Sequence, residues 1–307
     1  MAGQPPALSF NTTFDAATGH PVTVAPGLVR ITAPNAGPYT FKGTNSFIVG
    51  HDRVAVIDPG PDDDAHLMAL TSTIAGRPVE AIILTHTHID HSALVPKLKA
   101  ATGAPVWSGG KHRLSRPRRL FEVNAVGGES DWGLVPDRVL QDGEHVAIDG
   151  ITLEVIATPG HCANHLALGI AGTPWLLTGD HIMGWNSTLV SVPDGSMADY
   201  LHSLEKVIGL GYGHYAPAHG GSIEDGPDYA RALLAHRQER NRQVVAAVNG
   251  GARKIRDLLA PIYPQLALPL HGAALMTLKA HVEYLVDRGL IGATYGPFGT
   301  TLFPSRA

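Results

Sequence analysis

Cysteine is almost missing from this sequence, in which Cys162 is the only one among 307 residues. A single cysteine excludes an internal disulfide bond and a zinc site built from thiolates, and it fits a reducing cytoplasm. Any metal ion must therefore be held by histidine and carboxylate side chains.

Long apolar runs are missing as well. No segment approaches the roughly 18 consecutive apolar residues that predict a membrane span. The opening residues, MAGQPPALSFNTTFD, lack the charged and apolar regions of a secretory signal. We therefore expect a cytoplasmic protein without membrane contact. With 44% hydrophobic residues, the chain is long enough for one large domain and one small one.

Charged residues make up only 16% of the chain, and their signs are unevenly distributed. From residue 228 onward there are 10 Lys and Arg against 5 Asp and Glu, whereas the preceding part holds 13 against 22. The C-terminal part is thus mildly basic. That balance permits contact with an acidic polymer, although an ordinary solvated helical surface has the same composition.

Residues 1–226 alternate short β-prone runs with turns and a few helices, which predicts an α/β layered domain. Strands are predicted at 28–32, 46–49, 53–58, 81–85, 106–107, 145–148, 152–157, 165–168 and 175–178, and helices at 62–75, 93–102 and 197–209.

The pattern changes after Gly226 to long helical periodicities. Helices are predicted at 229–248, 252–263 and 273–288, followed by β-prone segments at 290–294 and 300–303. This order is typical of a winged helix. We therefore predict a catalytic domain over 1–226 and a helical linker with a small winged-helix domain over 227–307.

The segment LTHTHIDHSA at 84–93 places four ligand-type residues within six positions, directly after an apolar run. A loop that leaves a buried strand can aim His86 and His88 at one point. Asp90 and His91 begin the next turn and can face a neighbouring point. This density of ligand-type residues predicts a metal site.

The loop cannot complete two metal sites alone, since a dinuclear centre needs about six ligands and a bridge. Three other residues each follow a predicted strand and stand beside turn-forming residues. They are His161 in ATPGHCANH, Asp180 in LLTGD and His219 in YAPAHGG. We predict that they supply the missing ligands.

In these motifs the sequence resembles the metallo-β-lactamase fold superfamily. HTHIDH, TPGHCANH, TGDH and PAHG follow one another in the order that is typical of that family. The resemblance implies an αββα sandwich with the metals at one edge between the sheets. It assigns His86, His88 and His161 to one metal, Asp90, His91 and His219 to the other, and Asp180 as the bridge. It also implies that Asp58, in VIDPG, supports the ligand loops.

Two divalent ions would share a water, bring its pKa near neutrality and yield a bridging hydroxide for a hydrolase. Zinc is the commonest ion for such ligands, with manganese or iron as alternatives. Asp90 and Asp180 would act in catalysis while ligating. His181 either protonates the leaving group or packs beside the loop. His165 either bonds to a ligand or is a plain strand residue, and Cys162 is interpreted as a space-filling side chain.

The substrate stays open among several classes. The branch that this chain resembles combines the fold with a C-terminal winged helix and includes a single-strand-specific endoribonuclease. Segment 111–119 adds five basic residues, of which Arg116, Arg118 and Arg119 are candidate contacts to RNA phosphates. The alternative is a hydrolase of small esters, thioesters or lactones, with weak β-lactamase activity.

A second alternative is a non-catalytic module that binds nucleic acid. The C-terminal domain either grips nucleic acid or packs over the active-site edge and limits substrate size. Its third predicted helix has few basic residues, which is poor for gripping a groove. Self-association into a homodimer is a further expectation.

Overall fold

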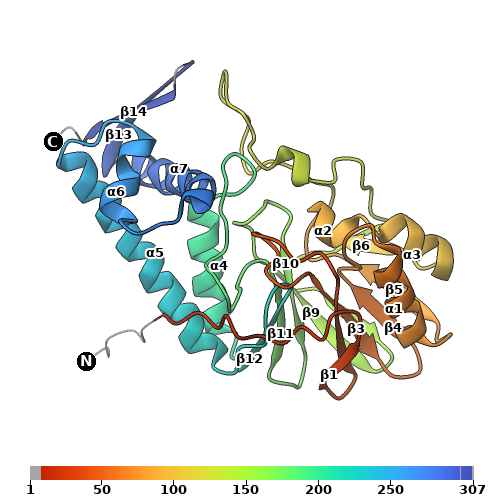
Figure 1. Ribbon diagram of the computed structural model, residues 1–307. Helices are drawn as coiled ribbons and strands as arrows, with labels where there is room; N and C mark the ends of the chain where they lie inside the picture. The colour runs from red at the N-terminus through yellow and green to blue at the C-terminus, as the bar shows by residue number, and fades with distance from the viewer. Residues whose placement is uncertain (1–7, 298, 306–307) are drawn as a thin grey trace.

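Two β-sheets lie face to face at the centre of the computed structural model, which describes residues 8–297 and 299–305 (Figure 1). Seven strands form the first sheet, in the order β1(Pro21–Ala25), β2(Leu28–Thr32), β3(Asn45–Gly50), β4(Val54–Ile57), β5(Val79–Ile83), β6(Val106–Ser108) and β7(Arg138–Val139). Its strands are antiparallel up to β4 and parallel from β4 to β7.

The second sheet has five strands. Their order is β12(His214–Pro217), β11(Trp175–Gly179), β10(Leu166–Ile170), β9(Ile151–Ala157) and β8(His145–Ile148). Only β11 and β12 pair in parallel. Apolar side chains from the facing surfaces of both sheets, such as Ile57, Ile83 and Val155, form one buried core between them.

Helices cover the outer faces of both sheets, which gives the four layers of an αββα sandwich (Figure 1). On the first sheet lie α1(Asp64–Ile74), the single turn α2(Ile89–Ser92) and α3(Val95–Thr102); η1(Gly127–Glu129) is a short 3-10 turn in the loop before β7. On the second sheet lie α4(Met197–Gly209) and α5(Gly226–Asn249). Polar residues set two helix starts: Asp63 accepts a bond from the backbone of His66, and Ser196 from that of Asp199.

The C-terminal part continues from α5 through η2(Ile255–Leu258), α6(Leu259–Ile262), η3(Leu268–Leu270) and α7(His271–Asp287) to a hairpin of β13(Ile291–Gly296) and β14(Gly299–Pro304). It has its own apolar core, to which Val244, Leu278 and Leu302 contribute. The first half of α5 packs on the second sheet through Ala230 and Leu233, so this one helix joins both parts.

Most predicted elements are present, with shifts of one to three residues at their ends. The strands β1, β7 and β12 were not predicted, because all are short and β12 ends in a proline. The helix predicted over 252–263 is only a 3-10 turn followed by one α-turn, and Pro264 stops it. The predicted order of helices and hairpin is otherwise observed, whereas a winged helix as such remains a prediction.

Within the described residues, no helix combines the length and the hydropathy that crossing a membrane requires.

Candidate metal centre

Every predicted metal ligand lies just beyond the carboxyl end of a strand, at one edge of the two sheets. The loop from Thr85 to His91 follows β5, and His161 follows β9 after a Pro-Gly turn. Asp180 follows β11 directly, and His219 follows β12. The sandwich thus brings together segments that lie up to 133 positions apart in the sequence, from His86 to His219.

The first group of ligands consists of three histidines. The Nε2 atom of His86 lies 3.0 Å from Nδ1 of His88, and Nε2 of His161 lies 2.9 Å from the same Nδ1 atom. The three ring nitrogens therefore converge on one point. Neutral imidazole nitrogens placed in this way can bind one cation together.

The second group combines two histidines with a carboxylate. Asp90 Oδ2 lies 3.4 Å from His91 Nε2 and 3.3 Å from His219 Nε2. The ligand atoms of each group lie within 4.8 Å of one another. This second group is chemically distinct from the first because it contributes a negative charge.

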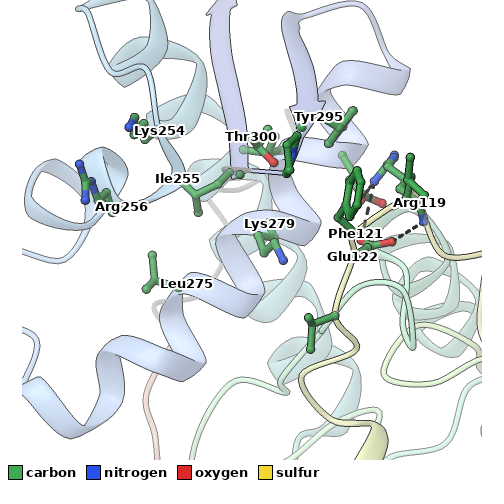
Figure 2. Close-up of a pocket in the computed structure, with 17 residues that line it drawn as sticks. Arg119, Phe121, Glu122, Lys254, Ile255, Arg256, Leu275, Lys279, Tyr295 and Thr300 are labelled. Carbon is green, nitrogen blue, oxygen red and sulfur yellow. Dashed lines mark hydrogen bonds and ion pairs between the residues drawn. The ribbon is translucent and has the colours of Figure 1, made fainter.

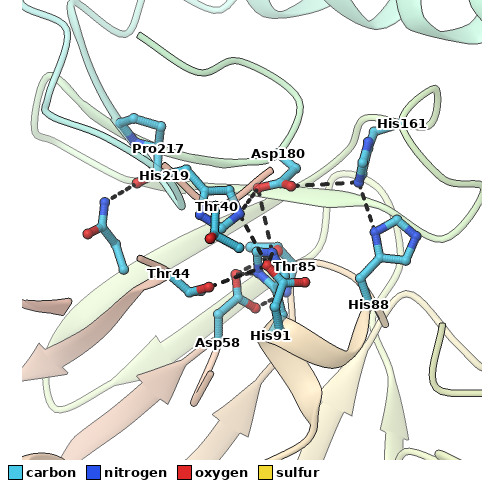
Figure 3. Close-up of polar contacts among 12 residues, drawn as sticks. Thr40, Thr44, Asp58, Thr85, His88, His91, His161, Asp180, Pro217 and His219 are labelled. Carbon is cyan, nitrogen blue, oxygen red and sulfur yellow. Dashed lines mark hydrogen bonds and ion pairs between the residues drawn. The ribbon is translucent and has the colours of Figure 1, made fainter. Parts of the chain in front are cut away.

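Asp180 stands between the two groups and directs one oxygen to each (Figure 3). Its Oδ2 lies 3.6 Å from His161 Nε2, whereas its Oδ1 lies 3.6 Å from His91 Nε2 and 3.3 Å from His219 Nε2. A carboxylate placed in this way can bridge two ions.

Two kinds of observation show that the residues fit divalent cations. His91 Nε2 and Asp180 Oδ1 are buried and lack a hydrogen-bond partner among the described residues, so both atoms are available to bind a cation at the point where they converge. Burial opposes the charged forms, yet the nearby histidines hold the pKa values of Asp90 and Asp180 well below the usual range. Against the same burial, Asp180 and Asp90 raise the pKa of His219 to about 10. The carboxylates thus create a field that attracts positive charge.

Asp58 holds the 85–91 ligand loop at two points. Its Oδ2 accepts a hydrogen bond of 3.0 Å from His91 Nδ1, and its two oxygens accept bonds of 2.7 Å from the backbone and the hydroxyl of Thr85. Its backbone adopts a left-handed φ of 50°, directly after β4. These contacts are those expected of a residue that orients a metal-binding histidine.

His165 supports the bridging position. Its Nε2 accepts a hydrogen bond of 3.0 Å from the backbone N–H of Asp180, and its Nδ1 lies 2.8 Å from Thr158 Oγ1. Since Nε2 is an acceptor, Nδ1 carries the proton and donates to the threonine. Burial and the nearby His181 and His161 keep the pKa of His165 well below its usual value, which preserves this neutral form.

Comparison with known proteins decides the family. A family model described as the Metallo-beta-lactamase superfamily matches residues 39–219, which is more than half of the chain. The chain belongs to the metallo-beta-lactamase superfamily. It is accordingly a metallo-hydrolase.

Relatives and solved structures of this superfamily extend over most of the chain. The Caenorhabditis elegans protein named Beta-lactamase-like protein 2 homolog is 26% identical, and the match covers 86% of this chain and 85% of that protein. The Aspergillus fumigatus Atrochrysone carboxyl ACP thioesterase is 26% identical, with 76% and 69% covered. The metallo-beta-lactamase family protein TTHA1429 from Thermus thermophilus has a TM-score of 0.74 and 27% identity, with 92% and 100% covered.

Asp194 is a functional candidate that the sequence did not reveal. It is fully buried, its Oδ2 lies 3.2 Å from His88 Nε2, and its Oδ1 lies 2.8 Å from His112 Nε2. Asp194 thus holds the second ring nitrogen of a metal ligand, as carboxylates commonly do in metal sites of this type. No strand or metal-ligand spacing marks this position in the sequence, which explains why it was missed.

We expect Asp194→Asn to lower the affinity for the ion held by His86, His88 and His161 by about 10–100-fold. The amide keeps the shape of the side chain but removes the charged acceptor that orients His88. The measurement is a metal titration of the protein after chelation. Asp199→Asn, at an exposed position on α4, is the control; equal affinities for the two variants would contradict the role of Asp194.

His181 does not reach the place that its predicted catalytic role requires. Its side chain is fully buried and packs edge-on against Tyr200, with ring centroids 5.1 Å apart. It does not line the cavity that opens above the predicted metal ligands. Burial lowers the pKa of His181 to about 3, so the imidazole is neutral near pH 7. Of the two interpretations of His181, these contacts favour packing beside the loop over proton donation to a leaving group.

Two of the three arginines predicted to contact RNA are engaged in ion pairs. Arg116 bonds to both Glu122 and Glu283, and Arg119 pairs with Glu283 as well. Arg118 is exposed and forms no ion pair with the described residues. These pairs join the 111–126 loop to α7, so the structure gives Arg116 and Arg119 a tethering role. A contact of the three arginines with RNA stays a prediction.

Cys162 is fully buried beside His161, and burial raises the pKa of its thiol well above the usual range. A protonated, buried thiol is a poor nucleophile, in agreement with its interpretation as a space-filling residue.

The metal centre opens into a cavity of about 490 Å³. Its floor includes His88, Asp90, His161, Asp180 and His219. Its walls come from four segments, at 37–40, 125–129, 183–191 and 263–277, and from Arg237 of α5. The last of these segments lies in the C-terminal part, so this part covers the active-site edge, as one of the two sequence interpretations held.

Proposed function

We propose that this protein is a dinuclear metal-dependent hydrolase of acyl thioesters. The observation that carries the proposal is the character of the cavity above the metal ligands. It is small, largely apolar, and closed on one side by the C-terminal part. Its apolar wall is formed by side chains that include Met183, Leu189, Leu266, Pro269, Leu270, Ala273, Ala274 and Met276.

The shape and charge of this cavity fit a compact apolar acyl group. A volume of about 490 Å³ lies in the range of small-molecule sites. Arg237 is the one Lys or Arg among its described lining residues, against the carboxylates of Asp90, Glu129 and Asp180. A polyanionic strand gains little from such a lining, because it is bound mainly through several Lys and Arg side chains.

The chemistry of the leaving group also favours a thioester as the substrate. Thiols have pKa values near 8.5, so a thiolate departs near neutral pH without first receiving a proton. The oxygen leaving groups of RNA and lactones are much stronger bases, so their departure gains more from a general acid. Since His181 is buried away from the cavity, a substrate that needs no such acid is favoured.

The residues of the site would bind the metal ions and position the attacking water. When bound, two divalent ions would polarise the thioester carbonyl and make a water nucleophilic at neutral pH. His86, His88 and His161 would hold one ion, Asp90, His91 and His219 the other, and Asp180 both. Asp90 faces the cavity with a side chain that is 27% exposed, and Thr44 donates a hydrogen bond of 3.3 Å to its Oδ2. Asp90 is thereby oriented to accept the proton of an attacking water.

The comparisons support thioesters and leave the ions open. One relative is named a thioesterase that acts on an acyl group held by an ACP, which is a carrier protein. A protein named TTHA1623, 27% identical over 65% of this chain, was solved in a di-iron-bound form. We propose two ions per chain, with zinc as the expected metal and manganese or iron as alternatives.

Cleavage of single-stranded RNA is retained as the second candidate, because Arg118 and several cations of the C-terminal part, such as Arg256, are exposed. The helix and hairpin order of residues 227–307 supports a winged-helix domain, whose role here would be to close the cavity.

A substrate panel tests the proposal on the metal-loaded protein. We expect the highest kcat/KM for a small acyl thioester, at least about tenfold above that for a lactone, a β-lactam or a labelled single-stranded RNA. Metal analysis of the same sample should give two ions per chain. Faster turnover of the RNA than of the thioester would replace the proposal by the second candidate.

Ala274→Trp should narrow the cavity from the side of α7, because Ala274 lines it and is only partly buried. We expect kcat/KM for an octanoyl thioester to fall by about tenfold or more, with little change for an acetyl thioester. Gly272→Trp, at an exposed position of α7 outside the lining, is the control. Equal effects on both acyl lengths would show that the acyl group lies elsewhere.

A further inference from the structure

A second groove, separate from the metal cavity, lies between the 119–123 loop and the C-terminal part (Figure 2). We call it the basic groove. Its volume is also about 490 Å³, and its described lining residues are Arg119, Leu120, Phe121, Glu122, Val123, Lys254, Ile255, Arg256, Leu275, Lys279, Val282, Glu283, Tyr295, Gly296, Pro297, Gly299 and Thr300. The mechanism proposed above uses none of these residues.

The charges in the basic groove are unbalanced. Its two carboxylates, Glu122 and Glu283, are both taken up by Arg116 and Arg119. Lys254 and Lys279 form no ion pair with the described residues, and Arg256 reaches only its neighbour Asp257, at 4.0 Å. The chain as a whole carries a net charge of −4, so these cations form a local exception.

Apolar side chains are exposed beside these cations. Leu120, Phe121 and Val123 are 82%, 67% and 73% exposed on one wall. On the opposite wall lie Ile255 and Leu275. Apolar residues next to a cationic rim are typical of a surface that docks another protein with an acidic face.

The basic groove and the metal cavity share two of the segments that line them, α7 and the loop at 119–129. Along α7, Leu275 and Lys279 line the groove, whereas Ala274 and Met276 line the cavity. Along the preceding loop, Val123 lines the groove and Val126 the cavity. A partner seated in the groove therefore contacts the same helix and the same loop that line the metal cavity.

We propose that the basic groove docks an acidic carrier protein, which presents its acyl group on a flexible arm to the metal centre. This inference rests on the proposed thioesterase function. Lys254, Arg256 and Lys279 would face carboxylates of the carrier, and the 120–123 loop would pack on apolar residues of its surface. The carrier would raise the local concentration of the acyl group at the cavity and would not alter the chemistry there.

The wall composition favours a protein over an RNA strand in the groove. Bases need exposed aromatic faces on which to stack. Tyr295 is covered by the guanidinium of Arg119, 3.9 Å from the ring centroid, so Phe121 is the one open aromatic face among the described lining residues. Aliphatic side chains make up the rest of the apolar surface.

The test compares one acyl group in two contexts, as an acidic acyl carrier protein thioester and as a short N-acetylcysteamine thioester. In the triple variant Lys254→Glu, Arg256→Glu and Lys279→Glu, we expect kcat/KM for the carrier substrate to fall at least about tenfold. The short substrate should change by less than about twofold. A control variant with Arg53→Glu, Arg231→Glu and Arg242→Glu changes the net charge equally at exposed positions outside the groove.

A binding measurement separates failure of this inference from failure of the proposed function. Fluorescence anisotropy of a labelled carrier protein, and in parallel of a labelled single-stranded RNA, follows docking without turnover. Carrier binding that the groove variant loses and the control retains supports the inference even if no thioester is hydrolysed. Equal loss for both thioesters, no loss for either, or binding of the RNA in place of the carrier would overturn it.

Discussion

Asp180→Ala should abolish hydrolysis, with a loss in kcat/KM of at least about 1,000-fold, and should release at least one metal ion per chain. Asp180 is the residue that reaches both ligand groups, with Oδ2 3.6 Å from His161 and Oδ1 3.3 Å from His219. Its removal takes a negative charge from both sites at once, and no other carboxylate among the described residues of the centre stands between them.

The experiment combines metal analysis with turnover of whichever substrate the wild type accepts. Asp199→Ala, on the exposed side of α4, serves as the control for the loss of a carboxylate. Full turnover of Asp180→Ala with two ions retained would exclude a dinuclear centre bridged by this residue. A variant that keeps one ion and little activity would show that one of the two groups still binds metal without the bridge.

Gly160→Ala should be strongly destabilising, at a cost of roughly 2–6 kcal/mol. Gly160 has a φ of +145°, which side chains rarely adopt. A Cβ there would lie 2.4 Å from Cα of Tyr200 and 2.7 Å from its backbone nitrogen. Because these are backbone atoms of α4, the clash cannot be relieved by rotating a side chain.

Urea unfolding of the metal-free protein measures this cost, and metal titration shows whether the neighbouring His161 has moved. Gly172→Ala is the control, since Gly172 has a φ of +77° and no atom within 4 Å of a built Cβ. It should cost only about 1–2 kcal/mol of left-handed backbone strain. If both variants lost the same stability, close packing against α4 would not be the cause.

The fold was largely accessible from the sequence because local patterns coincide with the tertiary structure in most elements. The strand at 145–148 and the helix at 197–209 have the predicted bounds. The short strand β12 escaped detection, since its four residues are stabilised by pairing with β11 and not by their own pattern.

The ligand set was accessible for a different reason. Each predicted ligand follows an apolar strand, and His161, Asp180 and His219 also stand beside glycine or proline, so the chemistry and the position of these residues are both visible locally. The structure brings all seven predicted ligands, from His86 to His219, into the two adjoining groups. By contrast, Asp194 becomes recognisable only through its contact with His88, and His181 is an ordinary motif neighbour until its burial is known.

The sequence by itself determined that this protein is built around metal ligands, because metal ligation needs particular side chains and only histidine and carboxylate were available. Only the tertiary structure decided which substrates and partners have access to these ligands. The pairing of Glu283 with Arg116 and Arg119, the apolar wall contributed by α7, and the basic groove beside it all depend on contacts between residues more than 100 positions apart. Such contacts leave no local pattern, since each partner alone is an ordinary surface or helix residue.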